Sequence, residues 1–518
     1  MDRNLLLAVA LSVAVYAGWF GFVDKRINPP VAHPASATAA YAGAAAASGA
    51  AASGPASASS SAAGAATPDA RDGASVLAAS MPVDLGGAQA RVDPRGAALS
   101  SVLEIEPLGR VELVADAREG MFSTWPELTF HRDDKAAEPT FTAARADGLQ
   151  IEKQFLPGQG TVLPRLRLSV RNPTRRALDV GPWTLSVGPG LGTIATEQKE
   201  NAKVSRVIGL TPEAGGLHGR VEKLKPGAHP GPYRWVAVDN RYFLAALLPN
   251  QDQFAPVEAA GPPPTLTLTA KPVTLSPGAS FTWDVPYYLG SKGEAWLSRY
   301  GLGLERSIDF GFFAQLGRGM LTALIWLHAR IGNWGWSIIA LTMLLQLILS
   351  PLTYKSLKAA AAMRTLQPQI ARLQERYKDD PSKLNGEMMA LYKKEGANPL
   401  GGCLPMVLQM PIFLALYNAL RNSWELHGVG WMFWIRDLSA KDPYYVLPLV
   451  MGGLMFAQSK LNPPAGDPTQ QQMMMFMPVI FTVMFLNFPS GLVLYWLTNS
   501  LVSTVLQLSL RNRLNPAT

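Results

Sequence analysis

The chain has 518 residues, a net charge of +8 and a mean hydropathy near zero, which averages a polar first part with an apolar last part. Its one cysteine, Cys403, excludes an intrachain disulfide, a CxxC metal site and a lipoprotein anchor after the first apolar segment. The six histidines are scattered without HExxH-like spacing, so we expect neither a metal nor a cofactor.

The first element is an apolar run over residues 5–23, flanked on both sides by basic residues. Its 19 residues are enough to cross a hydrocarbon core of about 30 Å. A cleaved signal peptide is the competing interpretation, but the run ends in bulky aromatic residues such as Trp19 instead of a small-residue cleavage site. We therefore predict an N-terminal transmembrane anchor over residues 1–23.

The next two segments differ sharply in composition. Residues 24–77 are mostly Ala, Ser, Pro and Gly, which bury too little apolar surface to offset the entropy of ordering, so we predict a flexible linker. Residues 78–302 alternate polar and apolar side chains, as in 102–116, 165–173 and 264–275. This pattern predicts an extracytoplasmic all-β sandwich domain. Without a G-x-S-x-G motif, a phosphate loop or paired catalytic carboxylates, its expected role is folding or docking, not enzymatic catalysis.

Residues 303–331 have an intermediate, amphipathic character. Arg318 interrupts their apolar residues, and Gly317 and Gly319 weaken a full membrane span. We therefore expect an interfacial amphipathic helix here, not a transmembrane helix.

Five apolar spans follow, at residues 334–353, 403–423, 444–458, 472–488 and 490–508. Prolines recur within or at the ends of these spans, and a helical bundle tolerates the kinks that they favour. Together with the anchor, the spans predict an α-helical polytopic membrane protein with six transmembrane helices. Five of them would form the core bundle, over residues 332–510.

Loop charges set the predicted orientation. Loop 354–402 carries nine basic residues against five acidic ones, whereas loop 424–443 is slightly acidic. By the positive-inside rule, the first loop, both termini and the short basic tail at 511–518 lie in the cytoplasm. The second loop and the β-domain then lie outside the cytoplasm. In a Gram-negative cell, this is a multi-pass protein of the inner membrane with a periplasmic β-domain.

The basic loop itself has a helical pattern. Helical periodicity runs from Lys355 to Lys378, and Asp380 and Pro381 provide an N-cap and an N1 proline for a second helix. We predict a cytosolic helical hairpin over residues 355–396. Its basic residues include Lys355, Arg364, Arg372 and Arg376. This charge suits ribosomal RNA or anionic lipid head groups, and a role in setting topology alone fits equally well.

Polar side chains interrupt the apolar spans. They are Thr342, Gln346, Ser350, Gln409, Asn499 and Ser503. The first three are spaced i, i+4 and i+8, so they lie within about 80° of one another on one helix face. Such residues either form interhelical hydrogen bonds of about 0.6 kcal/mol each or line a partly hydrated groove. The pattern alone favours neither.

Three long stretches carry a family resemblance. They are MRTLQPQIARLQERYKDDPSKLNGEMMALYKKEGANPLGGCLPMVLQMPIFLALYNAL (363–420), WIRDLSAKDPYYVLPLVMGG (434–453) and MPVIFTVMFLNFPSGLVLYW (477–496). Over about residues 334–510 the chain closely resembles the YidC-type membrane protein insertases of the Oxa/YidC/Alb superfamily. The anchor, linker and β-domain resemble the Gram-negative architecture of that family more loosely.

The resemblance implies a membrane protein insertase and membrane chaperone that works through a hydrophilic groove, alone or with the Sec translocon. Its implied partners are nascent membrane proteins, the lipid bilayer, the Sec translocon and the ribosome, and no specific nucleic-acid sequence. The implied slide for substrate helices consists of Met410, Pro411, Phe413, Tyr495 and Trp496. One departure concerns Gln346, because the family usually has a basic residue at this position. The resemblance therefore does not support charge-based recruitment of substrates here.

Two other functions compete with this interpretation. Transporters usually show internal repeats or ionisable residues at the membrane midplane, and the sequence shows neither. The second alternative is a membrane-anchored envelope binding protein whose β-sandwich captures a glycan or lipid. Five elaborate spans are more than such an anchor requires.

Overall fold

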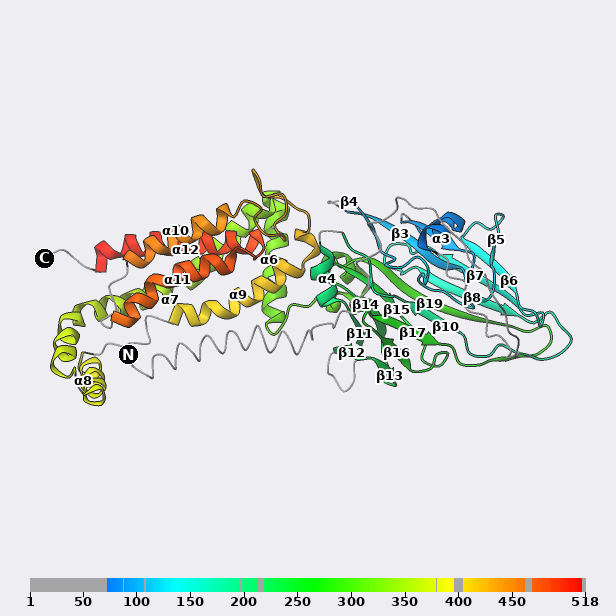
Figure 1. Cartoon of the computed structure of the whole chain (residues 1–518), viewed down its shortest axis with the longest axis horizontal. Helices are drawn as coiled ribbons and strands as arrows, with labels where there is room; N and C mark the ends of the chain where they lie inside the picture. Colours follow the sequence, from blue (N-terminus) through cyan, green and yellow to red (C-terminus); the bar gives the residue numbers. More distant parts are fainter. Residues whose placement is uncertain are drawn as a thin grey trace, which may run out of the picture.

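The computed structural model describes residues 72–514 with the exception of 87, 107–108, 195–196, 213–218, 379, 396–403 and 462–467. A β-rich domain forms one end of an elongated molecule, and a helical region forms the other (Figure 1). The predicted N-terminal anchor, most of the predicted linker and the last residues of the predicted tail lie outside the described residues.

The largest sheet of the β-domain has nine antiparallel strands. Their order is β12 (Val221–Leu224), β11 (Arg206–Leu210), β14 (Trp235–Asp239), β15 (Phe243–Leu247), β19 (Ser280–Ser291), β8 (Arg165–Arg171), β7 (Gln150–Leu156), β6 (Thr140–Ala144) and β5 (His131–Arg132). Strands β7 and β8 bury every second residue, as their alternating sequence predicts, because one sheet face covers the core. Strands β14 and β15 are instead buried on both faces.

The second face of β14 and β15 is covered by short helical elements. These are α5 (Glu294–Leu297), η3 (Ser298–Tyr300) and η4 (Leu304–Ser307). Leu297 and Leu304 are buried there in one apolar cluster with Trp235 and Leu244. This second layer explains why the two strands carry continuous apolar runs instead of alternating ones.

Three smaller antiparallel sheets complete the described part of the domain. Their orders are β1 (Met81–Asp84), β2 (Gln89–Asp93), β3 (Ala98–Glu106), β4 (Gly109–Glu112); β10 (Thr184–Val187), β17 (Thr265–Thr269), β16 (Val257–Ala260), β13 (Gly227–His229); and β18 (Thr274–Leu275), β9 (Leu178–Asp179). They share one apolar core with the nine-stranded sheet. At its centre, the ring of Trp183 lies 5.2 Å from that of Trp283 and 5.9 Å from that of Phe254.

Lys153 lies inside this domain and is fully buried. Its Nζ donates to the carbonyl oxygens of Gly96 at 3.0 Å, Ala97 at 2.8 Å and Phe122. Ala97 and Phe122 both have left-handed backbone conformations, with φ of 42° and 59°. One lysine amine thus joins two unusual loop conformations to the central sheet.

The ordered domain begins earlier than predicted. Helix α3 (Gly73–Ala79) includes residues that we assigned to the linker ending at 77. Asp72 caps this helix by accepting a hydrogen bond from the Ser75 N–H at 2.8 Å, and Val76 is buried. A cap and one buried valine are enough to order a turn of small residues that composition alone marks as flexible.

The helical region consists of seven α-helices and one 3-10 turn among the described residues. They are α6 (Ala314–Ile331), α7 (Trp334–Arg376), α8 (Pro381–Lys394), α9 (Leu404–Asn422), η6 (Trp424–Leu426), α10 (Val446–Leu461), α11 (Pro468–Phe485) and α12 (Ser490–Leu514). Two described segments, Trp334–Ser356 and Ser490–Ser509, are long and apolar enough to cross a bilayer. Shorter apolar segments cover Val446–Ser459 and Met475–Phe485.

Helix α7 differs from its predicted form. The sequence suggested a span ending at residue 353 and a separate hairpin arm from Lys355, but α7 is one helix of 43 residues with Pro351 and Pro368 inside it. Each proline removes only one backbone donor, so the other hydrogen bonds of the helix continue past it. The second hairpin helix, α8, begins as predicted, with the Asp380 side chain accepting from the Lys383 N–H at 3.1 Å.

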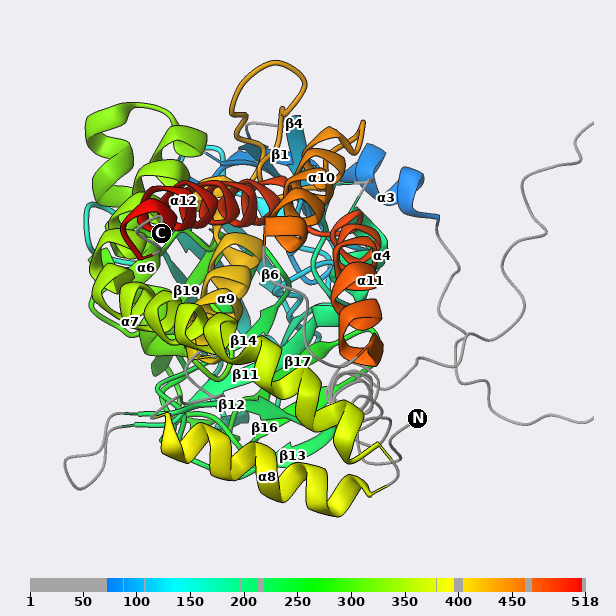
Figure 2. The same ribbon diagram turned by 90° about the vertical axis from the view of Figure 1, so that its left-hand side faces the viewer.

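The helices are arranged so that the hairpin and the β-domain lie at opposite ends of the molecule. Helix α8 and the end of α12 lie farthest from the β-domain (Figure 1), and α4 (Gln198–Val204) lies where the two parts meet. Figure 2 looks at the helical end and shows α12 beside α10, with α9 between α7 and α11. Helices α10 and α11 approach closely at Gly452, where an added Cβ would lie 2.0 Å from Thr482 Oγ1.

Candidate functional site

Polar residues of α7 and α12 meet inside the helical region. Gln346 is 7% exposed, and its Nε2 donates to Asn499 Oδ1. Thr342, one turn before Gln346, is fully buried and donates to the Ile338 carbonyl of its own helix at 2.7 Å. The predicted polar face of this span therefore turns toward α12.

A second polar link joins α9 to α12. Gln409 Nε2 donates to the hydroxyl of Tyr495, whose side chain is almost completely buried. Tyr495 and Asn499 are four residues apart and so lie on one face of α12. This single face holds the polar contacts to both α7 and α9.

Two predicted groove residues, Ser350 and Ser503, take no part in the Gln346–Asn499 and Gln409–Tyr495 hydrogen bonds. Ser350 is half-buried and donates to the Leu347 carbonyl of its own helix at 2.7 Å. Ser503 is also half-buried, one turn beyond Asn499. Among the described contacts, neither serine is bonded to Gln346 or Gln409.

An aromatic cluster lies between α9, α11 and α12. The rings of Phe413 and Trp496 meet edge to face with centroids 5.3 Å apart. Phe481 and Phe485 pack on Trp496 at 5.7 and 5.4 Å, and Phe488 lies 5.0 Å from Phe485. The sequence predicted the first two residues but missed the other three. Phe481 and Phe485, four residues apart in α11, have a helical spacing that could have marked them, whereas Phe488 follows the end of that helix.

The remaining predicted residues lie at more open positions. Met410 and Pro411 of α9 are half-buried, one turn before the aromatic cluster. Lys355, Arg372 and Arg376 are exposed along α7. Arg364 belongs to α7 as well, but its side chain lies outside the described residues.

The chemistry of the assembled groups is limited to hydrogen bonding and apolar contact. The described residues of the predicted groove and slide carry amide, hydroxyl, thioether and aromatic groups, with no carboxylate, imidazole or thiol. Such groups can solvate a polar chain segment and pack against an apolar one. They provide no strong acid or base at neutral pH.

A cleft in the β-domain bears on the alternative binding function. It has a volume of about 500 Å³ and is lined by Pro82, Val83, Asp84, Gln89, Ala90, Arg91, Ser101 and Leu103. Arg91 is the one cationic residue among the described residues that line it, and its guanidinium already donates to the Ser80 carbonyl at 3.0 Å.

The β-domain is joined to the helical region by residues that the sequence did not single out. The Arg241 Nε donates to the Arg421 carbonyl at 2.9 Å, and its Nη2 lies 3.4 Å from the Ser439 carbonyl. The Tyr242 hydroxyl donates to Ser439 Oγ at 3.2 Å, and its ring packs against that of His427 at a tilt of 32°, with centroids 4.0 Å apart. These residues lie far apart in the chain, so no local pattern marks them.

Comparisons with known proteins identify the family. Residues 112–323 match the family model described as the YidC periplasmic domain, and residues 326–517 match that of the 60Kd inner membrane protein. The membrane protein insertase YidC of Endomicrobium trichonymphae is 40% identical over 413 residues, which cover 77% of this chain and 78% of the relative. That of Cupriavidus necator is 45% identical over 276 residues, 53% of this chain and about half (50%) of the relative.

A solved structure also matches along most of the chain. It is an active YidC insertase with its first transmembrane domain resolved, 17% identical, with a TM-score of 0.41, and the match covers 83% of this chain and 92% of that one. The two family models together span the β-rich domain and the helical region. With the identity and coverage of the Endomicrobium relative, they show that this chain belongs to the YidC family of membrane protein insertases, inner-membrane proteins with a periplasmic domain.

Proposed function

We propose that this chain inserts membrane proteins into the inner membrane, and helps them fold, through a hydrophilic groove between α7, α9 and α12. The observation that carries the proposal is that Gln346 and Gln409, from two different helices, both bond to one face of α12. A face that collects amides and hydroxyls within apolar helices suits a polar chain segment on its way across the bilayer.

The groove would act by lowering a desolvation cost. Moving an unpaired peptide group into an apolar medium costs about 2–7 kcal/mol, and partners such as the Gln346 and Asn499 amides offset part of it. Each interhelical bond contributes only about 0.6 kcal/mol, so exchanging one for a bond to the substrate is inexpensive. Burial of the substrate's own apolar span in lipid then drives the step.

The aromatic cluster gives the proposed path an apolar side. Phe413 and Trp496 are adjacent to the polar links because Tyr495 and Trp496 are neighbours in α12. Met410 and Pro411 extend this side along α9. A substrate helix would leave the polar groups and pass along these residues into lipid. The proposal assigns no catalytic residue.

The proposed topology has six transmembrane helices, both termini in the cytoplasm and the β-domain in the periplasm. Its support is that the basic hairpin and the end of α12 lie opposite the β-domain (Figure 1). The exposed Lys355, Arg372 and Arg376 are then available on the cytoplasmic side for the ribosome, the Sec translocon or anionic lipids.

Reconstitution tests the proposed function. Proteoliposomes that contain only this protein should insert a small one-span substrate faster than empty liposomes do. A photo-crosslinker at position 346, 413 or 496 should label a stalled nascent chain, whereas one at the exposed, outward-facing Leu347 should not. Insertion no faster than in empty liposomes would contradict the proposal, and so would equal labelling from Leu347.

The envelope-binding alternative rests on the β-domain cleft. Deleting residues 78–300 separates the two functions, because insertion through the groove should survive the deletion, and glycan or lipid capture should not. Loss of all insertion in a stably folded deletion variant would favour a role of the β-domain in the activity itself.

A further inference from the structure

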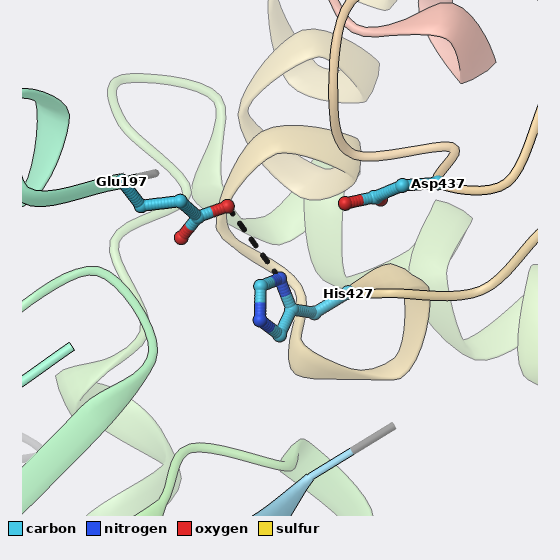
Figure 3. Close-up of side chains that lie close together, drawn as sticks. All are labelled: Glu197, His427 and Asp437. Atoms are coloured by element: carbon cyan, nitrogen blue, oxygen red, sulfur yellow. Dashed lines mark ion pairs between the residues drawn. The ribbon is translucent and has the colours of Figure 1, made fainter. Parts of the chain in front are cut away.

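A histidine and two carboxylates meet where the β-domain contacts the helical region (Figure 3). Glu197 comes from the N-terminal end of α4 in the β-domain. His427 follows η6, and Asp437 belongs to the segment that leads to α10. Because 230 residues separate the first member from the second (427 − 197), no short sequence motif could reveal this cluster.

The geometry of the cluster is close to that of a metal site. One ligand atom from each of the three residues lies within 4.8 Å of the others, and His427 Nδ1 lies 3.8 Å from Glu197 Oε1. Two ligands of a tetrahedral zinc ion are about 3.4 Å apart when each lies about 2.1 Å from the metal. Small side-chain movements would therefore bring all three groups into coordination range.

The surroundings hold these groups in place. His427 is 1% exposed, and the Tyr242 ring packs against its imidazole with centroids 4.0 Å apart and a tilt of 32° between the rings. Asp437 Oδ1 accepts hydrogen bonds from the Ser439 N–H at 2.8 Å and from its hydroxyl at 2.7 Å. These outer partners orient the carboxylate in the way that second-shell groups orient metal ligands.

The charge balance leaves room for a cation. The cluster itself contains two carboxylates, those of Glu197 and Asp437. Arg241 lies near them, with its Nη1 4.0 Å from Glu197 Oε1. The Arg241 guanidinium is engaged with the carbonyls of Arg421 and Ser439. With a neutral imidazole, the three ligands and Arg241 sum to one negative charge.

We propose that Glu197, His427 and Asp437 bind one divalent transition-metal ion of the zinc class, which joins the β-domain to the segment between α9 and α10. One imidazole nitrogen and two carboxylate oxygens suit zinc, with water as a fourth ligand. Magnesium and calcium prefer all-oxygen sites and fit this donor set poorly. Since two ligands come from one part of the molecule and one from the other, metal binding stabilises their contact.

Zinc titration of the chelator-treated, full-length protein in detergent tests the proposal. Calorimetry should show one zinc ion per chain without competition from magnesium, and cobalt should give the absorption bands of a low-symmetry site. The near-isosteric variants Glu197→Gln and Asp437→Asn should each weaken zinc binding by about 10- to 100-fold. His427→Gln should do the same, whereas His131→Gln, at an exposed residue of β5, should bind zinc like the unaltered protein.

A second measurement separates metal binding from a folding defect. Zinc should slow hydrogen exchange in residues 423–439 of the unaltered protein and of His131→Gln. At the same zinc concentration, just sufficient to fill the unaltered site, it should slow exchange far less in Asp437→Asn, which retains an acceptor for Ser439. Absence of zinc binding by the unaltered protein would overturn the proposal. Unchanged affinity in all three ligand variants would overturn it as well.

Discussion

Gln346 pairs with Asn499 at the position where the family resemblance implies a basic residue. A neutral amide pair offers hydrogen bonds to any polar segment but no Coulomb attraction to an acidic one. Because glutamine replaces a basic residue at position 346, this protein allows the effect of a polar groove on substrates to be measured apart from the effect of a positive charge.

Gln346→Arg should restore the charge. Insertion of substrates with acidic translocated tails should become several-fold faster, while substrates with neutral tails should be unaffected. The guanidinium costs about 2.5–3.5 kcal/mol at the centre of a membrane helix, so the variant should also be less stable unless water reaches it. Initial insertion rates in proteoliposomes measure the effect, with Gln346→Leu as an uncharged control. Equal acceleration for both tails would exclude charge recognition.

Lys153, buried in the β-domain, should make the stability of that domain depend on pH. Burial lowers the pKa of its amine well below the ordinary value of 10.5. The unfolded chain therefore binds more protons between the folded pKa and about 10.5, and the stability of the β-domain should rise with pH across that window. This contribution is lost as the pH falls through the folded pKa.

Lys153→Met should remove this pH dependence and the lysine's hydrogen bonds to three carbonyls, of which that of Gly96 still accepts from the Thr124 N–H at 3.1 Å. We expect a loss of about 2 kcal/mol at neutral pH. Pulse proteolysis of the full chain in urea at several pH values measures both effects. Lys271→Met, at an exposed lysine, is the matched control. An unchanged pH slope in Lys153→Met would show that other groups cause it.

The alternating sequence of β7 places Lys153 on the same face as Ile151 and Phe155. The sequence therefore could predict that the Lys153 side chain points into the core. Its three carbonyl acceptors could not be predicted, because they come from loops more than 30 residues away. The same holds in the helices. Periodicity placed Gln346 on a polar face, but only the packing of α7 against α12 selected Asn499 as its partner.

The predicted ends of the apolar spans agree closely with the observed helix ends where a sharp turn limits the helix. The span predicted at 403–423 is α9 (Leu404–Asn422), and the last span begins at Ser490 as predicted. Helix α11 begins at Pro468, four residues before the predicted 472, because its glutamines are good helix formers although they are not apolar. Hydropathy locates the lipid-facing part of a helix and not its full length.

Asp380→Ala should destabilise α8 by about 1 kcal/mol, because the first turn loses its side-chain acceptor for the Lys383 N–H. Hydrogen exchange in residues 381–394 should become faster, with no change in α12. Ser382→Ala alters a neighbouring exposed residue and keeps the cap, so it should exchange like the unaltered protein. Equal exchange in the two variants would show that packing, not the cap, holds this helix.

The whole molecule depends on contacts that no local pattern encodes. Arg241 reaches carbonyls 180 and 198 residues away, and Tyr242 reaches Ser439 across 197 residues. Domain order and the β-rich and helical classes could be predicted from composition and periodicity. The junction could not, because its contacts join residues 180 to 198 positions apart in the chain.

Arg241→Leu should loosen this junction without unfolding either part. Two charge-assisted, part-buried hydrogen bonds to carbonyls are lost, at about 1.5–3 kcal/mol each at most. Hydrogen exchange should become faster in residues 421–439 and stay unchanged in strands β7 and β8. Arg234→Leu removes a similar bond within the β-domain, from Arg234 to the Gly301 carbonyl, and should leave 421–439 unaffected. Faster exchange throughout the chain would point to general destabilisation instead.

The unbroken course of α7 has a mechanical consequence. At 1.5 Å per residue, its 43 residues extend about 65 Å, roughly twice the thickness of a hydrocarbon core. The rod is weakest in bending at Pro351 and Pro368, each of which lacks one backbone hydrogen bond. Both prolines lie between Gln346 and α8, the second helix of the hairpin. When the hairpin moves, α7 should therefore bend at Pro351 and Pro368, and the part of α7 that carries Gln346 should keep its packing against α12.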